Sequence, residues 1–140
     1  MLKIVKNQTN TSYIESVRGL LADDMAAVNA LIQNSLHSDV ALINQLSNYI
    51  INSGGKRLRP MLVLLAANAC GCKGSQHINL AAVIEFIHTA TRLHDGVVDA
   101  SLLRRGNVTA NARWGNEASI VVGGFLSAGA LDMMGAALGL

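Results

Sequence analysis

The sequence predicts an all-α protein, and three observations support that prediction. Apolar residues recur at the three- and four-residue spacing of amphipathic helices through most of the chain. Strand signals are weak, because there is one proline, few aromatic residues and no turn dipeptide between alternating apolar runs. The 140 residues, 51% of them hydrophobic and 14% charged, suit a single domain around one core.

The N-terminal 20 residues differ from the rest in being polar and weakly patterned. We expect residues 1–20 to form a leader or a frayed first helix, and residues 21–140 to form one helical domain. Asp23 and Asp24 are favourable helix-starting residues, and apolar residues follow them at helical spacing as far as Leu36. The first helix of the domain is therefore predicted here.

Further helices are predicted along the rest of the chain. One follows a cap at Ser38-Asp39 and stops at Gly54-Gly55. The next opens around Pro60, which a first helical turn tolerates. Another starts near Asn79, and a final apolar segment covers residues 112–140.

Charge and cysteine usage narrow the class of protein. The formal net charge is +2, with no long basic stripe of the kind that binds nucleic acid. Cys70 and Cys72 match neither a zinc pair nor a redox motif. A disulfide between them would be strained, so we expect two free thiols, which are typical of a reducing compartment. The N-terminus lacks a signal-peptide core, and charge-free apolar runs stop at 13 residues (60–72) and 14 residues (118–131), short of the roughly 18 to 20 that span a bilayer. We expect a cytoplasmic protein without a transmembrane segment.

Polar residues gather on one face of the helix that carries the stretch HDGVVD. A helix turns about 100° per residue, so Asp95 and Asp99, seven and eleven residues after His88, share with it a stripe roughly 40° wide, and Arg92 lies beside it. Two aspartates one turn apart repel each other unless a cation lies between them. Hard carboxylate oxygens favour Mg²⁺, which completes its coordination with water and substrate phosphates.

Basic residues flank this stripe in two places. Lys56 and Arg59 precede the helix that opens at Pro60, where free N–H groups also attract an anion, and Arg104 and Arg105 offer planar forks to phosphate oxygens. The aspartates would bind a metal ion, and each of the two basic pairs could bind a phosphate group. This combination suggests two phosphorylated substrates. Each feature alone has a plainer interpretation: a solvated aspartate face, a hydrogen-bonded core histidine, or a surface patch. Their joint occurrence favours the functional interpretation.

These residues resemble the trans-polyprenyl diphosphate synthases, and within that family the octaprenyl branch, over about residues 22–134. The matching segments, in order, are Gly54–Pro60, Ile84–Asp95, Val97–Asp99, Arg104–Gly106, Thr109–Asn111 and Val121–Gly123. The resemblance implies the N-terminal portion of an antiparallel helical bundle of the isoprenoid synthase type, an all-helical and dimeric fold with a deep cavity between helices.

The activity that the resemblance implies is a head-to-tail condensation of isopentenyl diphosphate with an allylic diphosphate. Carried over residue by residue, Asp95 and Asp99 would bind Mg²⁺, and Arg104 would hold the allylic diphosphate as a third catalytic residue. The residues implied for isopentenyl diphosphate are Lys56, Arg59, His88 and Arg105.

Product length is set in this family by residues that line the floor of the tunnel, four and five places before the first motif aspartate. Here they are Thr91 and Ala90, and neither is aromatic. The resemblance therefore favours a long all-trans product, such as the precursor of a quinone side chain.

The chain departs from the family pattern at three carboxylates. Gly96 replaces the second aspartate of Asp-Asp-x-x-Asp, Ala100 stands where an acid is common, and Gly124 replaces the aspartate of Val-Gly-Asp. Loss of a supporting group commonly lowers metal affinity or activity by about 10- to 100-fold. The second Asp-rich motif is also missing before Leu140, so we expect the 140-residue chain alone to be inactive or impaired, and prone to associate.

Two other functions remain open at this point. The missing acids suit a non-catalytic helical partner subunit of a heteromeric prenyl diphosphate synthase. A small apolar helical protein lying on membranes is a further alternative, but the helices lack the Lys-rich polar face that such a protein needs. Metal-dependent binding of an allylic diphosphate would favour the enzyme over the non-catalytic partner subunit.

Overall fold

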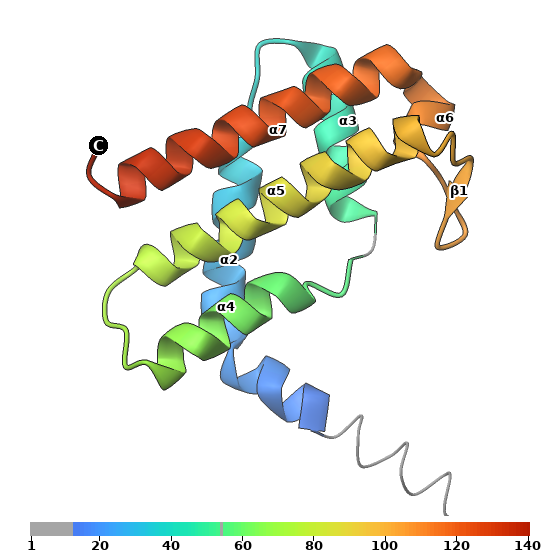
Figure 1. The fold of residues 1–140 in the computed structure, drawn as a ribbon. Coiled ribbons are helices and arrows are strands. Elements are labelled where there is room, and N and C mark those ends of the chain that lie inside the picture. Colours follow the sequence, from blue (N-terminus) through green and yellow to red (C-terminus); the bar gives the residue numbers. More distant parts are fainter. Residues whose placement is uncertain (1–12, 54) are drawn as a thin grey trace, which may run out of the picture.

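The computed structural model describes residues 13–53 and 55–140, and these form helices with one short hairpin (Figure 1). Residues 13–20 are helical, whereas residues 1–12 of the expected leader, and Gly54, lie outside the described residues. The remaining elements are α2 (Ala22–Ser35), α3 (Ala41–Asn52), α4 (Leu58–Ala69), α5 (Gln76–Val98), β1 (Leu103–Arg104), β2 (Asn107–Val108), α6 (Ala110–Trp114) and α7 (Asn116–Ala137). The all-α prediction is confirmed.

Helix α5 is the centre of the arrangement. It lies antiparallel beside α7, and this is the most extensive pairing of elements in the described part of the chain (Figure 1). α4 and α2 pack on α5 nearer its N-terminal half, while α3 packs on α7 and α6. The most deeply buried large side chains of this core are Leu21, Val28, Ile32, Leu46, Leu64, Phe86, Val122 and Leu126.

Two helix starts differ in detail from the prediction. Asp23 and Asp24 lie inside the first turn of α2, where they complement the helix dipole, and the cap position is the buried Leu21. Before α3, the Asn44 side chain accepts a hydrogen bond from the Ser38 N–H at 2.9 Å and donates one to the Ser38 carbonyl at 2.7 Å. The sequence indicated polar caps at both helix starts. Instead, the buried Leu21 precedes α2, and the start of α3 is held by the side chain of Asn44 from within the helix.

The hairpin β1–β2 was not predicted. Leu103 pairs with Val108 and Arg104 with Asn107. The turn residues Arg105 and Gly106 both have positive φ, at 51° and 78°. Two such residues in succession match the twist of a two-residue hairpin. Strands two residues long carry no detectable alternation, which explains why the sequence predicted only a glycine-containing connection.

Helix α7 is long and apolar enough, by length and composition alone, to cross a membrane. The sequence prediction counted only residues without charge, and Asp132 ends that count within the helix, so the run was too short to span a bilayer. One such helix is weak evidence, since core helices of soluble proteins pass the same test. The absence of a transmembrane segment therefore stays a prediction.

Candidate functional site: a basic depression beside an aspartate pair

Residues from α4, α5 and the hairpin turn line one depression on the surface. Lys56, Arg59, His88 and Arg105, which were predicted to hold one diphosphate, all lie in it. The other lining residues are Gly55, Arg57, Leu58, Glu85 and Arg92. The structure thus brings together side chains that are up to 49 positions apart in the sequence.

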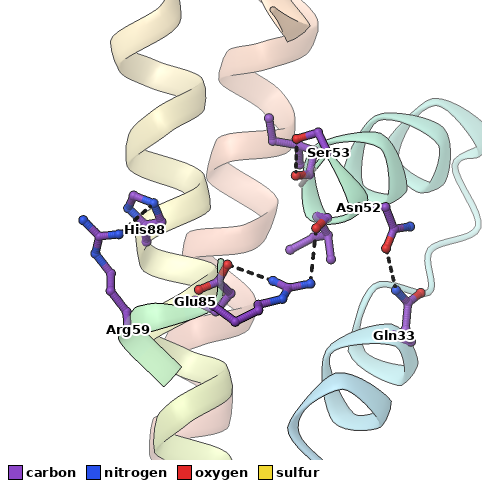
Figure 2. A network of polar contacts seen from close by, with 9 residues as sticks. Gln33, Asn52, Ser53, Arg59, Glu85 and His88 are labelled. Atoms are coloured by element: carbon purple, nitrogen blue, oxygen red, sulfur yellow. Dashed lines mark hydrogen bonds and ion pairs between the residues drawn. The ribbon is translucent and has the colours of Figure 1, made fainter. Parts of the chain in front are cut away.

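Arg57 fixes the loop that carries Lys56 and Arg59. Its backbone is left-handed, with φ of 55°, at the residue before α4 begins. One guanidinium nitrogen, Nη1, donates to Glu85 Oε1 at 2.8 Å, and Nη2 donates to the Ile51 carbonyl at 3.2 Å (Figure 2). The end of α3, the start of α4 and the middle of α5 are thereby joined through one side chain.

Arg59 and His88 are in direct contact across the depression. Arg59 Nη1 and His88 Nε2 are 3.1 Å apart (Figure 2). Because a guanidinium only donates, Nε2 must accept, which requires a neutral His88 with its proton on Nδ1. Burial, then the positive charge of Arg59, lowers the pKa of His88 below its usual value; Glu85 opposes this shift, while Arg92 and Arg105 reinforce it. His88 is therefore neutral at pH 7 and can donate from Nδ1.

Arg92 adjoins a second depression as well as the first. Arg104, Gly96 and Asn111 also line this second hollow, together with Tyr49, Ile50, Ser53, Leu93, Asn107, Val108, Thr109 and Ala110. Arg92 is half-buried. Burial, then the charges of Arg104 and Arg105, lowers the pKa of its guanidinium, against an opposing effect of Glu85. Positive charge is thus concentrated where the two depressions meet.

Asp95 and Asp99 lie one helical turn apart at the C-terminal end of α5, and both are exposed. The Asp99 N–H donates to the Asp95 carbonyl at 2.8 Å, so the helical turn between them is intact. Two carboxylates at the negative end of a helix dipole suit Mg²⁺ in the mode that relies on water and substrate phosphates. Within residues 13–53 and 55–140, no group of three His, Cys, Asp or Glu side chains could hold a metal ion by itself.

The predicted polar stripe therefore divides into two parts. His88 contacts Arg59 in the basic depression, and neither Asp95 nor Asp99 lines that depression. His88 thus lines the same depression as Lys56, Arg59 and Arg105, and its role in phosphate binding stays a prediction.

The three positions that lack a carboxylate have different surroundings. A Cβ at the buried Gly96 would lie 2.7 Å from Asn111 Oδ1, so a side chain there requires Asn111 to move. Asn111 is itself held by a hydrogen bond from its Nδ2 to the Ser101 carbonyl at 2.9 Å. Gly124 faces open space, and Ala100 has a left-handed backbone with φ of 48°.

The two tunnel-floor candidates point to different sides of α5. Ala90 is 3% exposed and belongs to the hydrophobic core, whereas Thr91 is exposed and its hydroxyl donates to the Ile87 carbonyl at 2.9 Å. Adjacent residues on a helix are rotated by about 100°, and their assignment to the tunnel floor stays a prediction. In this structure only Thr91 shares the exposed side of the helix with Asp95.

The sequence interpretation assigned no role to Arg57, Glu85 or Arg92. Glu85 offered a signal, because it is the one acid between residues 80 and 94 and stands one turn before His88. Arg92 stands four residues after His88, which places both on one face. The contact of Arg57 with Glu85 spans 28 positions and has no local signal.

Comparison with known proteins identifies a consistent set of relatives. A family model described as polyprenyl synthetase matches residues 40–138. Octaprenyl diphosphate synthase of Escherichia coli (strain K12) is 57% identical over 121 residues, which are 86% of this chain and 38% of that protein. Heptaprenyl diphosphate synthase component 2 of Bacillus subtilis (strain 168) is 36% identical over 118 residues, 81% of this chain and 33% of that protein.

Solved structures show the same relationship. A decaprenyl diphosphate synthase from Rhodobacter capsulatus aligns with a TM-score of 0.81 and 49% identity, over 86% of this chain and 37% of that one. A polyprenyl synthase from Caulobacter crescentus, complexed with calcium and isoprenyl diphosphate, aligns with a TM-score of 0.84 and 48% identity, with the same coverage. The chain thus spans less than two fifths of the length of each of these relatives.

Proposed function

This chain belongs to the polyprenyl synthetase family, and we propose that it serves a prenyltransferase that condenses isopentenyl diphosphate with an allylic diphosphate. The product proposed is a long all-trans polyprenyl diphosphate, which the names of the octaprenyl and decaprenyl relatives support. The observation that carries the proposal is the meeting of Lys56, Arg59, His88 and Arg105 in one depression. We further propose that residues 21–140 form part of a single helical domain.

We assign the isopentenyl diphosphate group to this depression. Lys56 supplies a point charge, and Arg59 and Arg105 supply planar donors that match phosphate oxygens. The contact of Arg59 Nη1 with His88 Nε2 leaves the Nδ1–H of His88 for a phosphate oxygen. The diphosphate is thereby held in one orientation, which directs the attached double bond.

We assign the allylic diphosphate to Arg104 and to the end of α5. There Asp95 and Asp99 would hold Mg²⁺, and the calcium in the similar Caulobacter structure supports a divalent ion in this family. When bound, such an ion neutralises the diphosphate and stabilises it as a leaving group. In the proposed reaction the allylic C–O bond breaks, the double bond of isopentenyl diphosphate forms the new C–C bond, and a proton is lost.

Three further assignments accompany this proposal. The exposed Thr91 side chain, one turn before Asp95, would border the growing chain and leave room for a long product. The exposed free thiols of Cys70 and Cys72 support a cytoplasmic location. A homodimer through the exposed apolar helices is the proposed assembly.

A chimera tests the proposed activity. Residues 22–138 of this chain would replace the matching segment of the Escherichia coli octaprenyl diphosphate synthase, and polyprenyl products would be measured with Mg²⁺ present. We expect long-chain product, increased by Gly96→Asp and abolished by Arg59→Gln. A folded chimera that makes no product, with or without Gly96→Asp, would contradict the enzymatic function.

A second candidate function is a non-catalytic partner subunit. Gly96 and Gly124 lack the carboxylates of the family pattern, and one relative is named as component 2 of a heptaprenyl diphosphate synthase. A chimera that becomes active only when Gly96→Asp and Gly124→Asp are combined would favour this alternative.

A further inference from the structure

Arg92 occupies an unusual position between the two depressions. It lines the basic depression together with Arg59 and His88, and it lines the neighbouring hollow together with Arg104 and Gly96. It is the residue that connects the position proposed for one diphosphate with the position proposed for the other.

The Arg92 guanidinium lacks an acidic partner in the described part of the chain. The ion pairs there are Arg57–Glu85 and His77–Asp24, and neither includes Arg92. Glu85 is the acid that influences Arg92, but its Oε1 already accepts from Arg57 at 2.8 Å. Arg59, Arg104 and Arg105 add positive charge around it.

A half-buried cation among other cations is unfavourable unless an anion compensates it. Burial removes part of the hydration of the charge, and the neighbouring arginines repel it. The lowered pKa of Arg92 reflects both effects. Phosphate oxygens, which accept planar bidentate hydrogen bonds from a guanidinium, are the ligand that this arrangement suits.

Gly96 leaves this charge available. It lies four residues after Arg92 along α5, and it places no acidic side chain in the hollow beside the arginine. The family pattern has an aspartate at this position. In this chain the hollow beside Arg92 is lined by glycine, and the guanidinium stays free for a ligand.

We propose that Arg92 is a further substrate-binding residue, whose guanidinium binds a diphosphate directly where the two depressions meet, so that part of the diphosphate affinity does not depend on a divalent metal. The proposal rests on the proposed function, because it concerns the same substrates. The fixed positive charge of Arg92 would supply part of the attraction that a carboxylate-bound metal would otherwise exert on the diphosphate.

Titration calorimetry with inorganic pyrophosphate tests the proposal, in EDTA and again with Mg²⁺. We expect the chain to bind pyrophosphate in EDTA, and Arg92→Gln to weaken that binding about tenfold or more, which corresponds to loss of one charge-assisted hydrogen bond. Arg92→Lys should retain part of the affinity. Lys73→Gln is the matched control, since it removes one positive charge from the loop before α5. The first residue of α5, Gln76, lies roughly 28 Å from Asp95 along the helix axis.

The outcomes separate this proposal from the proposed function. No pyrophosphate binding in EDTA, or equal affinities for Arg92→Gln and Lys73→Gln, would overturn the role of Arg92 and leave prenyl transfer by the chimera unaffected. Arg92-dependent binding in a chain whose chimera makes no polyprenyl product would support the role of Arg92 and refute the reaction. Circular dichroism of each variant shows whether its helices are intact.

Discussion

Gly123 and Gly124 are neighbours on α7 that meet different surroundings. A Cβ on Gly123 would overlap the ring nitrogen Nε2 of His94 on α5, whereas a Cβ on Gly124 would meet nothing within 4 Å. His94 Nε2 is buried without a hydrogen-bond partner among the described residues. The close approach of α5 and α7 therefore depends on one of the two glycines.

Alanine substitutions at these two positions should have opposite effects on stability. Gly123→Ala overfills the α5–α7 contact and is expected to lower the free energy of unfolding by about 1–3 kcal/mol. Gly124→Ala, its matched control, should raise that free energy by up to about 1 kcal/mol through helix propensity. Urea denaturation measures both, and equal effects would contradict the packing described here.

His88 should make the stability depend on pH. Its folded-state pKa lies below the usual value near 6.5, first because of burial and then because of Arg59. As pH falls below about 6.5, the unfolded state takes up a proton before the folded state does, so stability is complete above that pH and declines below it. Urea denaturation at pH 7.5, 6.5 and 5.5 should show a smaller decline for His88→Gln; an unchanged decline would contradict the assignment.

At the scale of residues, the sequence predicted four members of the basic depression but not their contacts. Lys56, Arg59, His88 and Arg105 could be identified because they belong to recognisable motifs. The neutral state of His88 and the bridging position of Arg92 depend on distances between helices, which local spacing does not determine.

At the scale of elements, the β1–β2 hairpin presents Arg104 and Arg105 to the two depressions. Gly106, with φ of 78°, completes its turn. Gly106→Ala should cost about 1 kcal/mol of stability and also weaken pyrophosphate binding, because a side chain is unfavourable at positive φ and the turn holds both arginines.

Gly74→Ala is the control for the hairpin. Gly74 has φ of 99° and open space around it, in the loop between α4 and α5. We expect a similar loss of stability with unchanged pyrophosphate affinity by calorimetry. If both variants bound pyrophosphate as the unaltered chain does, the hairpin would have no part in the site.

The Arg57–Glu85 pair joins three helices and should be important for stability. The side chains are 19% and 9% exposed, so Arg57→Ala leaves an almost buried carboxylate without its partner. We expect a loss of about 1–3 kcal/mol, below the 3–5 kcal/mol for fully buried pairs. Adding Glu85→Gln should recover part of the loss; no recovery in thermal or urea unfolding would contradict an ion-pair role.

The elements themselves were largely predictable, and their ends were not. Apolar periodicity located α2 to α5 and the final apolar segment, because buried faces repeat with the helical period. The structure starts α5 at Gln76, three residues before the predicted Asn79, and it separates α6 from α7 at Gly115, whose φ is 89°.

At the scale of the whole molecule, large apolar side chains remain exposed. They include Leu62 on α4, Ile84 and Ile87 on α5, and Ile120, Val121 and Leu131 on α7. Surfaces of this kind favour association. We expect the chain to sediment as a dimer or larger species at micromolar concentration, and a monomer under those conditions would contradict the proposed assembly.

The fold class and family could be predicted from the whole sequence, because motifs and periodicity agreed along most of its length. The direct contact of His88 with Arg59 could not, since it depends on where α4 packs against α5.

The decisive measurement is the affinity of the chain for isopentenyl diphosphate, followed by phosphorus-31 NMR as the chain is titrated. We expect saturable binding that Arg59→Gln weakens about tenfold or more, because one charge-assisted contact is lost, while Lys73→Gln leaves it within about twofold. Equal affinity for the two variants, or no shift of the phosphorus signals with the folded chain, would contradict it.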